Sequence, residues 1–162
     1  MGVLFSGREL INIAIGIERN GLAFYKSLLK VEKDAMARGA YKYLADMEEQ
    51  HIKTFQSMLN TVEEYGHPQI YTEEYDLYLK ALVDSAVFTD DKVAREMAEN
   101  ARSSAEAIQI ALGAEKDSIL FYYDMRNLVR ERDREAVDKI IEEEKSHLKQ
   151  LSDLKKSLSK RG

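Results

Sequence analysis

The feature that most constrains the fold is a Glu-x-x-His motif that occurs twice in the chain. Glu48 and His51 form the first copy, and Glu144 and His147 form the second, at an offset of 96 residues. Residues three apart in a helix lie on the same face, so a helical segment would place each carboxylate beside its imidazole. Two copies at this separation indicate that the chain contains one structural unit twice.

The segments upstream of the two motifs repeat as well. Residues 6–28 align with residues 103–125 at an offset of 97. Each copy opens with Ser-x-x-Glu, the capping-box pattern that marks the N-terminus of a helix. The repeat therefore predicts two copies of one helical hairpin, at residues 6–63 and 103–158, which a crossover at residues 64–102 connects.

Apolar residues spaced three and four apart predict amphipathic helices throughout both hairpins. The predicted long helices cover residues 7–34, 37–63, 104–130 and 133–158. The crossover contains Gly66-His67-Pro68, which breaks a helix, and then two more helical patterns near residues 72–87 and 90–101. Short connections within each hairpin make its helices antiparallel neighbours. We expect an all-α fold: one domain over residues 1–162, in which a four-helix bundle has one long helical crossover.

Each long helix has an apolar seam that is interrupted near its middle by a glutamate. The seam of the first helix reads Ala14, Glu18, Gly21, Tyr25 and Leu28. Glu18 and Glu48 are equidistant from the predicted turn at residue 33, so they should lie at one height of the bundle. Glu115 and Glu144 are related in the same way to the turn near residue 130.

Four carboxylates inside a bundle need partners, because each would have a desolvation cost on the order of several kcal/mol. Two divalent cations would balance the four negative charges. One Glu from each of two helices, with Glu-x-x-His from each of the other two, is the ligand pattern of two-metal sites in helical bundles. The predicted metal ligands are Glu18, Glu48, His51, Glu115, Glu144 and His147. Glu48 and Glu144 are the candidates for bridging both ions.

These motifs and the helix order resemble the ferritin-like di-iron carboxylate superfamily, and within it the rubrerythrin-like branch. The resemblance covers nearly the whole chain and implies two iron ions, peroxide or dioxygen as the oxidant, and a homodimer. Rubrerythrins usually have a further glutamate where this chain has Ser118, and a cysteine-rich rubredoxin domain, whereas this sequence has no cysteine. We therefore expect electrons to come from an external donor protein or from the iron itself. Oxygen and imidazole ligands also suit manganese, cobalt or zinc.

Tyr25 and Tyr122 follow Glu18 and Glu115 by seven residues and share their helix faces. Their phenols are expected to hydrogen-bond a ligand carboxylate or to supply an electron, and the alternative is an ordinary buried tyrosine. Gly21 and Ser118 leave room either for an oxidant molecule or for close helix packing.

Composition excludes several other classes of function. The formal charge is −5, which does not favour nucleic-acid binding, and no apolar run is long enough to cross a membrane. Without cysteine there is no disulfide, zinc–thiolate site or iron–sulfur cluster. The first residues lack the pattern of a secretory signal, so a cytoplasmic location is expected.

Two further hypotheses remain open beside a redox enzyme. One is iron binding or storage without turnover. The other is a structural or interaction bundle that metal ions stabilise, in which Tyr71, Tyr75 and Tyr78 of the crossover form a dimer surface.

Overall fold

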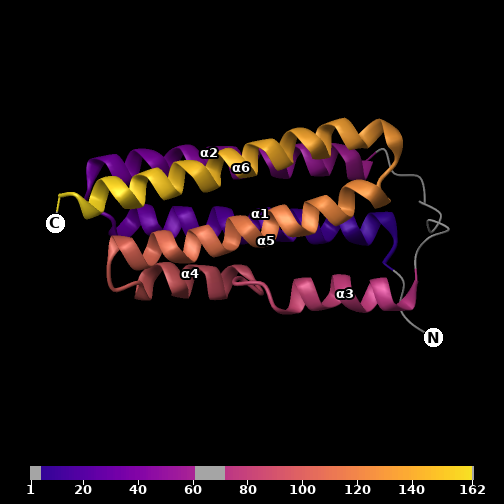
Figure 1. Ribbon diagram of the computed structural model, residues 1–162, viewed down its shortest axis with the longest axis horizontal. Helices are drawn as coiled ribbons and strands as arrows, with labels where there is room; N and C mark the ends of the chain where they lie inside the picture. Colours follow the sequence, from indigo (N-terminus) through magenta and orange to yellow (C-terminus); the bar gives the residue numbers. More distant parts are fainter. Residues whose placement is uncertain (1–4, 61–71, 162) are drawn as a thin grey trace.

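The computed structural model describes residues 5–60 and 72–161, and every regular element in these ranges is a helix. The helices are α1 (Gly7–Val31), α2 (Ala35–Asn60), α3 (Glu73–Asp84), α4 (Asp91–Asn100), α5 (Ser104–Leu128) and α6 (Glu131–Ser159). Figure 1 shows α1 antiparallel to α2, α5 antiparallel to α6, and the two pairs packed together as a four-helix bundle. The prediction of an all-α bundle with a helical crossover is confirmed.

Local hydrogen bonds explain where the helices begin and end. Ser6 and Glu9 form the predicted capping box at α1, and the Ser103 side chain caps α5. The first hairpin turn spans residues 32–34 and is centred on residue 33, as predicted, but α1 ends at Val31 and not at residue 34. The Glu32 carboxylate accepts hydrogen bonds from the backbone N–H groups of Lys33 and Asp34, which stabilises a turn there.

The crossover runs along the α1 and α5 side of the bundle, with α4 beside one half and α3 beside the other (Figure 1). The linker between α3 and α4 is held by two residues that are equivalent in the sequence repeat, Asn20 and Asp117. The Asn20 Nδ2 atom donates to the Phe88 carbonyl at 3.4 Å, and the Val87 N–H donates to the Asp117 Oδ2 atom at 2.8 Å. The linker therefore bridges the two hairpins.

The tyrosines of α3 face the bundle through their hydroxyl groups. Tyr75 and Tyr78 both donate to the Asp124 carboxylate on α5, at 2.7 and 3.2 Å. The described residues do not include 61–71. Three predictions fall in this range: the role of Tyr71, the helix breaker at residues 66–68, and the end of the second helix at residue 63. The homodimer stays a prediction.

The apolar core formed by residues 5–60 and 72–161 consists of two clusters, one in each half of the bundle. One cluster includes Ile11, Phe55, Met125 and Ile140, and the other includes Phe24, Leu44, Ile108 and Leu151. Between the clusters each long helix presents polar side chains at mid-height. The packing of both ends thus fixes the positions of the polar groups between them. None of the described helices is long and apolar enough to span a membrane.

Candidate metal centre

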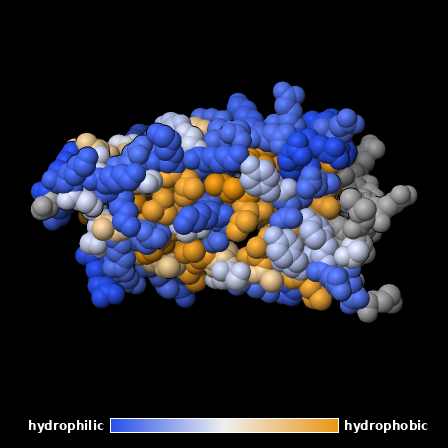
Figure 2. Space-filling model, in the orientation of Figure 1, coloured by the Kyte–Doolittle hydropathy of each residue, from blue (hydrophilic) through white to orange (hydrophobic). Residues whose placement is uncertain are grey.

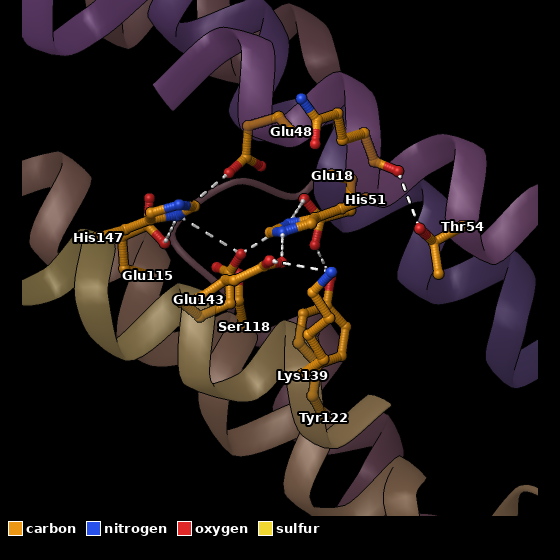
Figure 3. A network of polar contacts seen from close by, with 12 residues as sticks. Glu18, Glu48, His51, Thr54, Glu115, Ser118, Tyr122, Lys139, Glu143 and His147 are labelled. Carbon is orange, nitrogen blue, oxygen red and sulfur yellow. Dashed lines mark hydrogen bonds and ion pairs between the residues drawn. The ribbon is translucent and has the colours of Figure 1, made fainter. Parts of the chain in front are cut away.

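The six predicted ligand side chains come from all four long helices and meet between the two apolar clusters. Figure 3 shows Glu18, Glu48, His51, Glu115 and His147 pointing toward one another. Their exposed fractions are between 0 and 4%. α1 contributes Glu18 and α5 contributes Glu115, while α2 and α6 contribute one Glu-x-x-His motif each. The equal heights expected from the two turns are therefore found.

The ligand atoms form two overlapping groups. In each group, one atom from every residue lies within 4.8 Å of the others. The first group is Glu18, Glu48, His51 and Glu144, and the second is Glu48, Glu115, Glu144 and His147. Glu48 and Glu144 belong to both groups, whereas each of the other residues belongs to one. Two positions that share two carboxylates are the arrangement that a bridged pair of cations requires.

Both histidines turn the Nδ1 atom toward the carboxylates. The His51 Nδ1 atom is 2.9 Å from the Glu144 Oε1 atom, and the His147 Nδ1 atom is 3.6 Å from the same oxygen. The two rings are stacked with their centroids 5.7 Å apart. Each imidazole therefore presents its Nδ1 atom to the shared carboxylate of Glu144, in a position to supply one nitrogen to one cation.

Tyr25 and Tyr122 contact the cluster reciprocally across the two hairpins. The Tyr25 hydroxyl on α1 donates to the Glu115 Oε1 atom on α5, and the Tyr122 hydroxyl on α5 donates to the Glu18 Oε1 atom on α1. Each tyrosine thus orients the glutamate of the opposite hairpin and not the glutamate of its own helix. Glu18 belongs only to the first ligand group, and Glu115 belongs only to the second.

Glu143 is a site residue that the sequence analysis missed. Its Oε2 atom lies 2.9 Å from the His51 Nε2 atom, which is the ring nitrogen that does not approach Glu18 and Glu144 (Figure 3). The Lys139 Nζ atom lies 3.9 Å from the other oxygen of Glu143. A carboxylate in this position fixes the ring orientation and tautomer of a ligand histidine.

The second histidine has a different environment. Met47 occupies the position equivalent to Glu143 in the repeat, 96 residues earlier. The His147 Nε2 atom is buried and has no hydrogen-bond partner among the described residues. The ring of Tyr43 meets the imidazole edge-on, with the centroids 6.2 Å apart. The two halves of the centre are therefore chemically unequal.

Several oxygen and nitrogen atoms of the cluster are buried without a hydrogen-bond partner in the described part of the chain. They are Glu48 Oε1, Glu115 Oε2, Glu144 Oε2 and His147 Nδ1. Atoms of this kind cost free energy unless something binds them. They are oxygen and imidazole ligands at positions that face one another, so the residues fit two divalent cations.

The pKa shifts of the metal-free cluster show the same need for positive charge. Burial and the neighbouring carboxylates raise the pKa values of Glu48 and Glu144 well above their ordinary range. Burial opposes ionisation of Glu115 as well, but the neighbouring His147, whose Nδ1 atom lies 3.7 Å from the Glu115 Oε2 atom, and Glu144 outweigh it and lower the pKa of Glu115. Burial acts to lower the pKa of His51, and the Glu18 and Glu143 carboxylates raise it overall. Without metal, the centre must hold protons in place of cations.

Comparison with known proteins gives the family. The family model described as Rubrerythrin matches residues 9–155, which is most of the chain. The chain belongs to the rubrerythrin family. No curated protein matches this sequence.

A solved structure supports the fold of this rubrerythrin-family protein. It is a Thermotoga maritima protein that is described as ferritin-like and diiron-carboxylate, with a TM-score of 0.69 and 24% sequence identity. The match covers 96% of this chain and 98% of that one. The family and the buried cluster together indicate a site for two metal ions.

Gly21 and Ser118 of this rubrerythrin-family chain lie directly against the centre. A Cβ atom at Gly21 would be 2.5 Å from the Glu48 Oε2 atom, so the absence of a side chain gives this carboxylate its position. The Ser118 hydroxyl donates to the Ala114 carbonyl one turn earlier in α5. Close packing is thus one role of Gly21, and both residues also line a cavity.

Proposed function

We propose that this protein is a di-iron redox protein that reduces peroxide or dioxygen, with oxidation of ferrous iron. Glu18 and His51 would hold one ion, and Glu115 and His147 the other. Glu48 and Glu144 would bridge the pair. The observation that carries the proposal is the overlap of two buried ligand groups in these two carboxylates.

Two ferrous ions bound here would supply the two electrons that reduction of one peroxide molecule consumes. The protein's own residues set the conditions for this reaction. The phenols of Tyr25 and Tyr122 hold the terminal glutamates in place, and Glu143 holds His51. The apolar clusters above and below shield the centre from solvent on two sides, which strengthens the electrostatic interactions in it.

Iron is favoured over other metals by the match to a family of di-iron proteins, although manganese, cobalt and zinc suit the same ligand types. The reducing equivalents would come from a separate donor protein or from ferrous iron. The protein would work as a homodimer in the cytoplasm, with a small-molecule oxidant and no nucleic acid or membrane as partner.

The test is to add two equivalents of Fe(II) to metal-free protein without oxygen, then to mix it with H₂O₂ or with O₂. Near-ultraviolet absorbance follows the oxidation. We expect both oxidants to oxidise the bound iron, with H₂O₂ the faster. Glu144→Ala is the comparison that should abolish the fast phase. Oxidation no faster than that of Fe(II) free in buffer would contradict a redox function and favour binding or storage.

A further inference from the structure

A cavity of about 230 Å³ lies between α1 and α5, beneath the end of α3 and the linker to α4. Its inner wall includes Tyr25, Glu48 and Glu115 of the metal centre. Its other walls include Ile17, Phe88 and Phe121, which are apolar. The cavity therefore joins an apolar chamber to the two-metal site.

Small residues on the two facing helices create this space. Gly16, Gly21, Ala114 and Ser118 all line the cavity, and a Cβ atom at Gly16 would meet nothing within 4 Å. The linker covers part of the space, and Asn20 and Asp117 hold its backbone from opposite helices. On the face in Figure 2, apolar residues gather in a central band over α5 and its borders with α3 and α4.

The size of the cavity exceeds what a peroxide or dioxygen molecule requires. A water molecule takes about 30 Å³, so the cavity has room for about seven. An apolar protein cavity of about 150 Å³ is already large enough to bind benzene. A volume of about 230 Å³ fits a compound somewhat larger than a single aromatic ring.

The polar groups of the lining are mostly engaged already. The Tyr25 hydroxyl donates to Glu115, the Ser118 hydroxyl to a backbone carbonyl, and Asn20 to the linker. Buried water needs two to four polar partners, and these walls would satisfy few molecules. Among the described residues that line the cavity, the buried oxygens without a hydrogen-bond partner are Glu48 Oε1 and Glu115 Oε2, and both residues are part of the inner wall.

We propose that this cavity binds a small apolar organic compound, of about the size of a bicyclic aromatic ring, with an oxygen-bearing end toward the metal centre. The apolar body lies against Ile17, Phe88 and Phe121. The oxygen faces Glu48 and Glu115, where the cations of the proposed function would receive it. The orientation rests on that proposed function, whereas the binding itself depends only on the cavity.

The probe is 2-naphthol, a fluorescent bicyclic compound with one hydroxyl group. The chain has no tryptophan, so naphthol emission can be excited separately from that of the protein. Titrations use zinc-loaded protein, since zinc has no redox chemistry, and metal-free protein. We expect saturable binding of one naphthol per chain.

Two variants fill the cavity from opposite helices. Gly16→Leu enters open space on α1, and Ala114→Leu gives α5 a side chain as large as its repeat equivalent, Ile17. Gly39→Leu is the matched control, because a Cβ atom there also meets nothing within 4 Å and Gly39 is exposed on α2. Naphthol should bind at least tenfold more weakly to both filled variants and unchanged to the control. Circular dichroism and the zinc stoichiometry check that each variant is folded.

Two results would overturn the proposal: no saturable binding to the unmodified protein, or equal binding to the unmodified protein and both filled variants. The zinc stoichiometry of the same samples tests the metal site independently. Naphthol binding without two zinc ions per chain would support the cavity site and contradict the proposed function. Two zinc ions per chain without naphthol binding would support the metal site on which the proposed function depends and would contradict the cavity site.

Discussion

Gly21→Ala should weaken metal binding although it adds only one methyl group. The new Cβ atom would lie 2.5 Å from the Glu48 Oε2 atom and 3.2 Å from its Cδ atom, so the carboxylate must move. Glu48 belongs to both ligand groups, and its displacement affects both cations. Gly16→Ala is the matched control on the same helix, because its Cβ atom meets nothing within 4 Å.

Two opposing contributions to the free energy, helix propensity and overpacking, determine how Gly21→Ala changes stability and zinc affinity. Replacing glycine by alanine inside a helix stabilises the protein by about 1 kcal/mol, and this gain applies to both variants. Overpacking a well-filled site costs about 1–3 kcal/mol. If that cost falls on the metal-loaded state, where Glu48 has to bind, the affinity falls about fivefold to a hundredfold, because 1.4 kcal/mol corresponds to a factor of ten.

Zinc titration against a chromophoric chelator measures this change. We expect Gly21→Ala to lose affinity for zinc while Gly16→Ala keeps the affinity of the unmodified protein. Thermal unfolding without metal should show that Gly16→Ala has a free energy of unfolding up to about 1 kcal/mol higher than that of the unmodified chain. Unchanged zinc affinity in Gly21→Ala, or an equal loss in both variants, would refute the reasoning.

Three further predictions concern the surroundings of the ligands. Tyr122→Phe removes the hydrogen bond to Glu18, so zinc should bind about tenfold more weakly at one of its two sites, which calorimetric titration resolves; Tyr123→Phe, beside it and exposed, is the control. Glu143→Gln should weaken binding at the His51 position by a similar factor, whereas Met47→Leu, at the equivalent position, should not. Without metal, the raised pKa values of Glu48, Glu144 and His51 mean that the folded state binds more protons than the unfolded state. Stability should then fall as pH rises from about 5 to 8, despite the opposite contribution of Glu115, and excess zinc should remove the decline. Urea unfolding at several pH values tests this, and stability that rises with pH in chelator would contradict it.

Helix periodicity and the internal repeat were enough to predict the fold. The apolar seams required the four long helices to face one another, and the two turns required their glutamates to lie at one height. The predicted ligands then followed from residue type and position. All of these inferences depend on local spacing, which a sequence displays directly.

The details that the sequence analysis missed depend on contacts between distant residues. Glu143 stands in a run of three glutamates, and the repeat pairs it with Met47, so comparison of the two halves hid its contact with His51. The reciprocal pairing of Tyr25 with Glu115 depends on how the hairpins dock, which periodicity does not specify. The early end of α1 reflects side-chain hydrogen bonds of Glu32, a residue that periodicity alone assigns to the helix.

The two residues that hold the linker between α3 and α4, Asn20 and Asp117, leave a trace in the sequence. Asn20 and Asp117 occupy equivalent positions in the two copies, and both are polar residues next to apolar seams. Their common role became clear only with the position of the linker. The cavity beneath it could not be predicted, because its volume depends on how α3 and the linker lie across the gap between α1 and α5.

An anaerobic titration of metal-free protein with Fe(II), followed by a count of the ions retained, tests the central claim most directly. We predict two ions per chain in the unmodified protein, loss of both in Glu48→Ala and Glu144→Ala, and loss of mainly one in Glu18→Ala. One ion or none in the unmodified protein, or two in either Glu48→Ala or Glu144→Ala, would contradict a metal pair bridged by these carboxylates.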